Sequence, residues 1–397
     1  MSANPADPIV IVAAARTPMG GFQGDFNSLT CSQLGSAAIK AAVERAGLKP
    51  EQVDEVIMGC VLPAGQGQAP ARQASLGAGL PLAAGCTTVN KMCGSGMRAA
   101  MYAHDMLLAG SVDVMVAGGM ESMSNAPYLL PKARGGYRLG HGEVKDHMFL
   151  DGLEDAYDKG RLMGTFAEDC AGAYKFTREA QDAFAVASTT RAKQANTDGS
   201  FAWEIAPVTV SGRKGDVVID KDEQPFKAQL EKIPTLKPAF RKDGTVTAAN
   251  SSSISDGAAA LVMMRASTAA RLGLKPVATM VGHSTFAQEP GLFTTAPVGA
   301  MKKLLAKNNW SVGSVDLWEI NEAFAVVTMA AMHDLDLPHD KVNVHGGACA
   351  LGHPIGASGA RVIVTLIGAL KKCGKQRGVA SLCIGGGEAT AVGIELC

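Results

Sequence analysis

The sequence lacks an excess of either charge, and it lacks any apolar run long enough to cross a bilayer. Lysine plus arginine and aspartate plus glutamate each number 37 among 397 residues, so the formal net charge is zero. A neutral chain has no bulk attraction for nucleic acid or an anionic membrane, although a local basic patch can still face an anionic small molecule. The first residues, MSANPADP, lack the basic segment of a secretory signal. We therefore expect a soluble, cytoplasmic protein without nucleic-acid or membrane partners.

Cysteine is present, but in no pattern that would bind a metal or build a disulfide framework. The nine cysteines stand at positions 31, 60, 86, 93, 170, 349, 373, 383 and 397, with no C-x-x-C pair and no histidines at zinc spacing. Free thiols in a reducing compartment fit this usage better. The first strand runs into RTPMGGFQG instead of G-x-G-x-x-G, so a nicotinamide-binding dehydrogenase does not fit either. We expect neither a metal nor a redox cofactor.

What the sequence does have is a regular alternation of strand and helix patterns. The predicted strands cover residues 9–16, 53–59, 86–90 and 111–119, and the helices between them cover 31–47, 69–79 and 94–110. Such alternation is typical of βαβ units on a mostly parallel sheet with helices on both faces. The predicted fold class is therefore α/β, and the chain is long enough for two or three domains.

The second half of the chain repeats patterns of the first half. Three pairs of segments resemble each other: 52–60 with 314–324, CGSGMRAA with 354–362, and 112–122 with 378–390. In the last pair, aligning the glycines sets Gly118 opposite Gly385 and Val116 opposite Cys383. Two copies of one fold that differ at matching points would place a shared site between them.

Between the two copies the composition changes. Residues 120–248 are rich in glycine, proline and charged residues, and helical patterns interrupt them at 165–174 and 177–196. A long excursion of this kind is usually a lid or a binding insertion. We predict a first core half at 1–119, completed by about 249–272, an inserted loop domain at 120–248, and a second core half at 273–397.

Cys93 lies between a strand pattern and a helix pattern, in VNKMCGSGMRAA. At a helix start, free N–H groups and the positive end of the dipole stabilise a thiolate, which predicts a lowered pKa. Gly94 and Gly96 leave backbone N–H groups open to an incoming carbonyl. Cys93 is thus a candidate nucleophile, and a buried structural cysteine is the alternative.

Three further residues occupy similar junctions. His353, in GGACALGHPIGASGA, is a candidate general base, with a capping or core histidine as the alternative. Cys383 ends a strand before three glycines, where a thiol could move a proton beside oxyanion donors or merely precede a β-turn. Asn321, in EINEAF, could orient a water or cap a helix. Because such junctions gather at the carboxyl edge of a parallel sheet, these residues and Cys93 predict one site.

Four motifs occur in the order found in thiolases: VNKMCGSGMRA, NEAF, GGACALGHPIGASG and CIGGG. The sequence resembles this family over essentially its whole length. The resemblance implies a five-layered αβαβα fold built from two similar halves, with a loop domain that covers the active site and contributes to CoA binding and oligomerisation. It further implies a homotetramer (a dimer of dimers) or a dimer. The CoA thioesters would be substrates, with no cofactor.

The resemblance also implies a role for each candidate. Cys93 would take up the acyl group as a thioester, and His353 would remove its proton. Cys383 would exchange a proton with the α-carbon of a second acetyl-CoA. Asn321 would hold a water that forms one oxyanion hole with His353, and the N–H groups of Cys93 and Gly385 would form another.

Substrate contacts follow from the resemblance in the same way. The residues expected near acetyl-CoA are Ser252, Met163, Phe240, Ala323, Phe324, Leu153, Lys227 and Phe293; for the apolar members, ordinary core packing is the alternative. The chain departs from the family where Leu162 replaces a common histidine, and Lys227 is the one basic residue near the shifted DE turn. These departures affect the expected acyl-chain preference and CoA binding.

The predicted function is a biosynthetic-type thiolase, an acyltransferase that condenses two acetyl-CoA reversibly to acetoacetyl-CoA and CoA. A degradative 3-ketoacyl-CoA thiolase for longer chains in fatty-acid oxidation is the alternative within the fold. A ketoacyl synthase fits less well because such enzymes lack the second cysteine of CIGGG. A non-catalytic acyl-CoA or sterol carrier would not need all four chemical residues.

Overall fold

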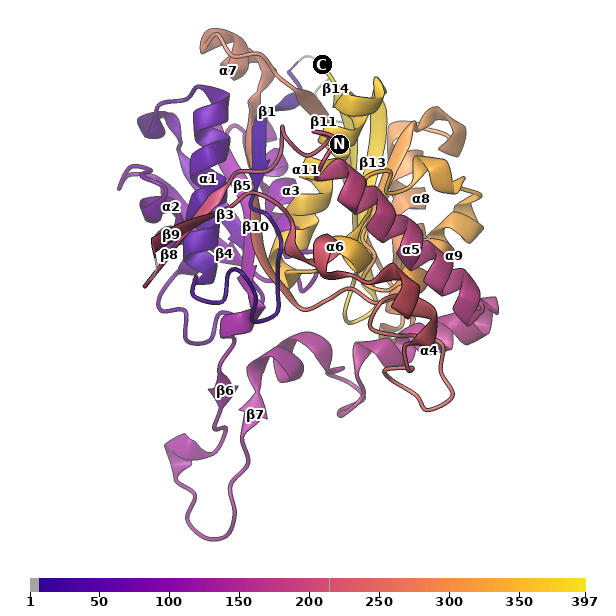
Figure 1. The fold of residues 1–397 in the computed structure, drawn as a ribbon. Coiled ribbons are helices and arrows are strands. Elements are labelled where there is room, and N and C mark those ends of the chain that lie inside the picture. The colour runs from indigo at the N-terminus through magenta and orange to yellow at the C-terminus, as the bar shows by residue number, and fades with distance from the viewer. Residues whose placement is uncertain (1–6, 214) are drawn as a thin grey trace.

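A computed structural model describes residues 7–213 and 215–397 of the chain (Figure 1). At its centre is a ten-stranded mixed sheet, whose strands are, in spatial order, β12 (Leu317–Ile320), β13 (Arg377–Ile384), β14 (Glu388–Leu396), β11 (Ala278–Ala287), β1 (Ile9–Arg16), β10 (Ser255–Arg265), β5 (Val114–Ser122), β3 (Glu55–Gly59) and β4 (Gly85–Val89), with β2 (Gly20–Gly21) paired to β10. Within the described residues, no helix has the length and hydropathy that a membrane crossing needs.

The sheet consists of two similar halves, as the sequence repeat predicted. In the first half, β1 and β10 pair antiparallel, β10 and β5 pair antiparallel, and β5 and β3 pair parallel. The second half repeats this pattern with β11, β14, β13 and β12. Only a short antiparallel contact between β1 and β11 joins the halves, and β4 extends the first half alone.

The prediction of a mostly parallel sheet was wrong. The parallel pairs are β3–β4, β3–β5 and β12–β13, and the other ladders of the sheet are antiparallel. Two features of the chain reverse the strand direction. β10 enters between β1 and β5 from the opposite end, and β13 turns back into β14 at Gly386 and Gly387, whose φ angles of 92° and 85° suit glycine.

The predicted pairing of Val116 with Cys383 was also wrong, because it aligned glycines instead of strand positions. Equivalent aspartates fix the register: the side chain of Asp54 accepts the N–H of Val114, and that of Asp316 accepts the N–H of Arg377. Val114 and Arg377 therefore occupy equivalent positions in β5 and β13. Six residues further along each strand, Met120 is the counterpart of Cys383.

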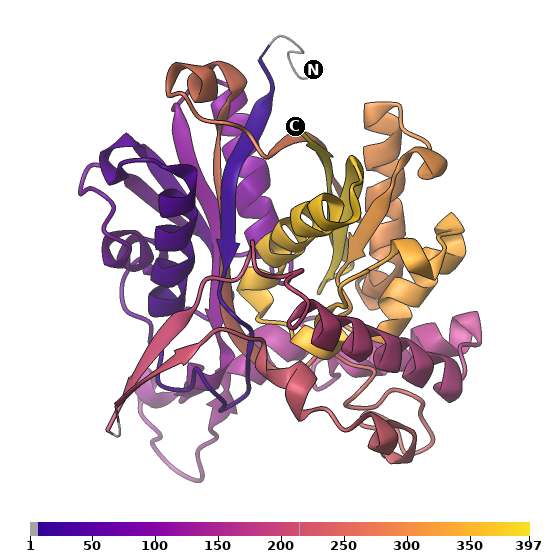
Figure 2. The same ribbon diagram turned by 45° about the horizontal axis from the view of Figure 1, so that its top comes forward.

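Helices and sheet form five layers. The helices α1 (Cys31–Ala46) and α2 (Pro70–Gly77) cover the outer face of the first half. The helices α3 (Ser95–Leu108) and α11 (Ile355–Cys373) lie between the halves, as Figure 2 shows for α11. The helices α8 (Ala296–Asn308) and α9 (Ala325–Leu335) cover the second half. This is the expected αβαβα arrangement.

The two central helices touch because glycines face each other. A Cβ atom at Gly96 of α3 would lie 2.7 Å from the backbone nitrogen of Ala360, and one at Gly359 of α11 would lie 2.3 Å from that of Met97. Both distances are too short for any side chain. The close contact brings the start of α3, which follows Cys93, next to the start of α11, which follows His353.

Local signals explain where several elements begin and end. Thr30 caps α1, because its side chain accepts the N–H of Gln33, and Gly47 ends that helix with a φ of 70°. Thr177 caps the helix α5 (Arg178–Ala195) in the same way. The strand β1 is buried along its whole length, which matches its uninterrupted apolar sequence.

A long segment joins β5 to β10 and covers one end of the sheet. It contains β6 (Tyr128–Leu129) and β7 (Lys145–Asp146), α4 (Met163–Tyr174), α5, β8 (Val208–Gly212), β9 (Gly215–Ile219) and α6 (Glu223–Lys227). The β6–β7 hairpin projects away from the body of the molecule, whereas α4 and α5 pack against that body (Figure 1). The remaining short helices are α7 (Ala266–Arg271) and α10 (Ala348–Leu351).

Candidate active site

A largely apolar cavity of about 350 Å³ lies where both sheet halves meet the inserted segment. Both sulfur-bearing candidates, Cys93 and Cys383, line it together with His353 and Gly385. The sequence repeat predicted a shared site between the halves, and the cavity has this position. It receives Cys93 from the first half and the other three residues from the second half.

A tight turn between β4 and α3 holds Cys93. Ser95 closes the turn, since its hydroxyl accepts the N–H of Lys91 at 2.8 Å and donates to the carbonyl of Met92 at 2.7 Å. Met92 has a φ of 48°, a conformation uncommon for a residue with a side chain. The backbone N–H groups of Gly385 and of Cys93 itself act on the Cys93 thiol and favour its ionised form.

The thiol of Cys93 is not acidic, contrary to the prediction from its place at a helix start. Burial raises its pKa to about 11, and this effect outweighs the N–H groups of Gly385 and Cys93, which act in the opposite direction. The predicted donors are therefore present, but the surrounding protein excludes the water that would solvate a thiolate. At neutral pH, Cys93 is a neutral thiol that needs a base.

His353 has the protonation state of such a base. Its Nδ1 lies 2.5 Å from the hydroxyl oxygen of Ser358, which itself donates to the carbonyl of Pro354 at 3.0 Å. Ser358 therefore accepts a hydrogen bond from the Nδ1–H group, and the lone pair remains on Nε2, which is buried without a hydrogen-bond partner. Burial, assisted by the charge of Arg361, lowers the pKa of His353 to about 3. The imidazole is neutral.

Cys383 is more enclosed than Cys93. It lies near the end of β13, is 1% exposed, and pairs across the ladder with Ala389 of β14. Burial raises the pKa of its thiol well above the ordinary value, and negative charge on Cys93 raises it further. The two sulfurs are thus close enough that ionising one opposes ionising the other.

Asn321 is fully buried and does not line the cavity. It follows β12, and its backbone N–H donates to the carbonyl of Ser381 at 3.0 Å. Arg361 donates to its Oδ1 at 3.3 Å, which leaves the Nδ2 group without a partner. Because a guanidinium can only donate, this contact fixes which end of the amide faces Arg361. The Nδ2 group therefore keeps its N–H donors unused.

Most of the predicted substrate-contact residues also line the cavity. They are Leu153, Met163, Phe240, Ser252, Phe293, Ala323 and Phe324. The Ser252 hydroxyl donates to the carbonyl of Ala323 at 3.0 Å, and the rings of Phe240 and Phe324 meet edge to face at 6.0 Å. Lys227 is not brought to the cavity. Its ammonium group forms an ion pair with Glu223, whose carboxylate also accepts the N–H of Gly21.

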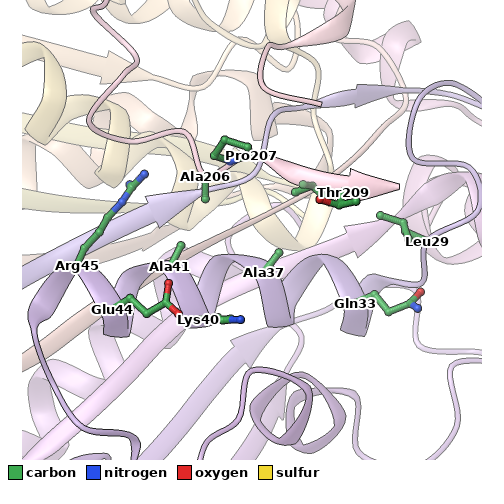
Figure 3. Close-up of a pocket in the computed structure, with 11 residues that line it drawn as sticks. Leu29, Gln33, Ala37, Lys40, Ala41, Glu44, Arg45, Ala206, Pro207 and Thr209 are labelled. Carbon is green, nitrogen blue, oxygen red and sulfur yellow. The ribbon is translucent and has the colours of Figure 1, made fainter. Parts of the chain in front are cut away.

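A larger hollow of about 710 Å³ lies elsewhere, between α1 and the segment 206–209 (Figure 3). Its lining contains no cysteine or histidine, and its charged members are Lys40, Glu44 and Arg45. Arg45 is already used by the fold, because it donates to the carbonyls of Trp203 and Ile205, both at 2.6 Å. Size alone therefore does not identify the chemical site.

Comparison with known proteins identifies the chain. Residues 9–267 match the family model "Thiolase, N-terminal domain", and residues 274–396 match "Thiolase, C-terminal domain". The chain belongs to the thiolase family. Acetyl-CoA acetyltransferase 2 of Arabidopsis thaliana is 52% identical to this thiolase, covering 100% of this chain and 98% of the relative. Acetyl-CoA acetyltransferase of Cupriavidus necator is 49% identical, covering 98% and 99%.

A solved structure agrees with the fold of this thiolase. The acetyl-CoA acetyltransferase of Bacillus anthracis superposes with a TM-score of 0.96 at 43% identity, covering 98% of this chain and 99% of the other. The five-layered fold predicted from the sequence is thereby confirmed.

Sequence reasoning missed part of the cavity lining of this thiolase. The residues not singled out as contacts are Met92, Phe149, Gly152, Leu162, Gly164, Ala239, Ala248, Ser251, Ser253, Ile254 and Ile355. Several are direct neighbours of motif residues: Met92 precedes Cys93, and Ser251 and Ser253 flank Ser252. Their position beside a motif was the available signal. Phe149 and Gly152 carried no such signal, because they belong to a short π-helix, Phe149–Leu153, that lies outside the motifs.

Proposed function

We propose that this thiolase condenses two acetyl-CoA molecules reversibly to acetoacetyl-CoA and CoA through an acyl-Cys93 intermediate. The observation that carries the proposal is the meeting of two thiols and a neutral imidazole at one apolar cavity. The names of the relatives in Arabidopsis thaliana and Cupriavidus necator support the same reaction.

In the first half-reaction, the Cys93 sulfur attacks the thioester carbonyl of acetyl-CoA. A thiol with a pKa of about 11 and an imidazole with a pKa of about 3 do not exchange a proton at rest. Transfer to Nε2 of His353 therefore accompanies formation of the carbon–sulfur bond. The N–H groups of Cys93 and Gly385 hold the carbonyl oxygen. The CoA sulfur leaves with the proton of Cys383, so a Cys383 thiolate and a His353 imidazolium remain.

In the second half-reaction, a second acetyl-CoA enters. The Cys383 thiolate is strongly basic, because burial raises its pKa, and it removes a proton from the α-carbon. His353 imidazolium and a water on Asn321 stabilise the enolate oxygen. The α-carbon attacks the acyl group on Cys93, and the released Cys93 sulfur takes the proton from His353. Each group returns to its starting state.

The acyl-chain preference is the finer part of the proposal. Phe293 lies in the lining next to bulky neighbours, with its ring 6.0 Å from that of Phe166, and is only 3% exposed. A buried aromatic side chain in the lining reduces the space for an acyl chain in the cavity, which favours a short acyl group over the longer chains of a degradative thiolase.

An assay series separates the two functions. Thiolysis of acetoacetyl-CoA is compared with thiolysis of 3-ketoacyl-CoA substrates of eight to sixteen acyl carbons. We expect kcat/KM to fall as the chain lengthens. A rise with chain length would replace the proposal with the degradative function. Condensation of acetyl-CoA alone, followed by release of CoA, tests the synthetic direction.

We further propose a cytoplasmic homotetramer whose reaction needs no metal or redox cofactor at the cysteines. Free cysteines support a reducing compartment. Exposed apolar side chains on and beside the β6–β7 hairpin, including Tyr128, Leu130 and Leu139, support contact with other copies of the chain. Light scattering of the intact protein, and of a variant with a shortened hairpin, tests the assembly.

A further inference from the structure

Three metal-ligating side chains from distant parts of the chain meet at the surface, where the end of α3 lies against β11. His104 and Asp105 belong to α3, and His283 belongs to β11. The Oδ1 atom of Asp105 lies 3.1 Å from Nδ1 of His104 and 2.8 Å from Nε2 of His283. All three ligand atoms lie within 4.8 Å of one another. We propose that His104, Asp105 and His283 bind one divalent transition-metal ion, with Zn²⁺ as the best match.

The spacing suits such an ion. Ligand atoms of a tetrahedral zinc site lie about 2.0–2.1 Å from the metal, hence roughly 3.3 Å from each other. The two separations that involve Asp105 are close to this value, at 3.1 and 2.8 Å. Two imidazoles and one carboxylate are a donor set that zinc accepts, with water from the solvent as the fourth ligand.

The two rings are held in place before any ion binds. Their side chains are only 5% and 12% exposed, and their planes meet at 88° with centroids 5.1 Å apart. Asp105 is 56% exposed, so the open side of the cluster faces solvent.

The positive charge of Lys307 disfavours a metal ion at this site. The ammonium of Lys307 donates to the backbone carbonyl of His283 at 3.2 Å, and its charge acts on both histidines. We therefore expect micromolar rather than nanomolar affinity. Among residues 7–213 and 215–397, no other three histidine, cysteine, aspartate or glutamate side chains converge in this way.

The position of the cluster gives a bound ion a structural role. α3 begins two residues after Cys93 and ends beside His104 and Asp105, whereas β11 belongs to the second half of the sheet. An ion held by both elements would connect the central helix to the second half. An ion that binds only the folded state stabilises it in proportion to its concentration. No step of the proposed reaction passes through this site.

The test uses the full chain, in which the cysteines that could also bind zinc are first replaced or blocked. The exposed cysteines are changed by Cys373→Ser and Cys397→Ser, the active-site thiols are alkylated, and the protein is freed of metal with a chelator. Titration with Zn²⁺ should show one ion per chain. At a zinc concentration a hundred times the Kd, Tm should rise by about 3–5 °C. Co²⁺ should give the visible absorption of a four-coordinate site.

Two variants and a matched control make the test specific. Asp105→Asn, at an exposed position that tolerates the change, and His283→Gln should each weaken binding at least tenfold and abolish the rise in Tm. His333→Gln is the control, because His333 also contacts an aspartate, Asp334, at 3.0 Å but, among the described residues, has no third metal-ligating side chain beside it; the variant should bind zinc like the parent. Binding that survives Asp105→Asn, or no binding at millimolar zinc, would overturn the proposal.

Discussion

The two thiols at the cavity come from similar halves of one fold, yet their surroundings differ. Cys93 is half-buried in the turn between β4 and α3. Cys383 lies inside β13, is 1% exposed, and pairs with Ala389 of β14. The comparison teaches that a duplicated fold supplies two nearby positions, and that local backbone decides their chemistry. The accessible sulfur suits a covalent carrier, and the enclosed one suits a proton carrier.

The largest loss of activity is expected when the accessible sulfur is removed. Cys93→Ala should lower kcat for condensation by at least about 10⁴-fold, because no covalent intermediate can form. Mass spectrometry after incubation with acetyl-CoA should show no acetylated protein, whereas the parent gains one acetyl group. Acetylation of the variant at the same site would show that another nucleophile carries the acyl group.

Removing the enclosed sulfur should separate the two half-reactions. Cys383→Ser keeps a similar volume but replaces a strong base with a hydroxyl, so condensation should fall about 10³-fold. Acetyl loading of Cys93 should stay within about tenfold of the parent in a rapid-quench measurement, if water can supply the proton that the leaving CoA sulfur takes. If acetyl loading and condensation fell by the same factor, the two cysteines would not have the separate roles proposed for them.

The raised pKa of Cys93 predicts a steep pH dependence of alkylation. Below a pKa of about 11 the thiolate fraction of Cys93 rises tenfold per pH unit, and only the thiolate reacts with iodoacetamide. Inactivation should therefore accelerate continuously from neutral pH to about pH 10 and be slowed by acetyl-CoA. A rate that levels off near neutral pH would mean that the helix start dominates over burial.

This result bears on what the sequence could predict. The motifs around Cys93, His353 and Cys383 predicted that these residues meet, because each motif marks the end of a strand or the start of a helix. In the structure all three line one cavity. The sign of the Cys93 pKa shift was wrong, since burial depends on the inserted segment that covers the cavity. His104 and His283 are far apart in sequence, so no spacing pattern could reveal their contact.

A smaller loss of activity is expected when His353 loses its hydrogen bond to Ser358. Ser358→Ala removes the hydroxyl that accepts the hydrogen bond of Nδ1–H, so the imidazole loses the contact that keeps its lone pair on Nε2. We expect kcat to fall about 10–100-fold with little change in KM, because the substrate does not touch Ser358. Ser358→Thr, which restores a hydroxyl, should recover part of the loss if the larger side chain is tolerated. An equal effect on KM would point to disturbed packing instead.

The smallest effect on kcat is expected at an ion pair that connects the segments next to the two thiols. Lys91, two residues before Cys93, pairs with Glu388, which follows the glycine turn after Cys383. Both side chains are partly exposed, at 25% and 35%, so the pair contributes about 1 kcal/mol or less. Glu388→Gln should lower kcat no more than about threefold, and salt should reduce activity of the parent but not of the variant. A loss comparable to that of Ser358→Ala would mean that the pair, and not the backbone of each turn, sets the distance between the sulfurs.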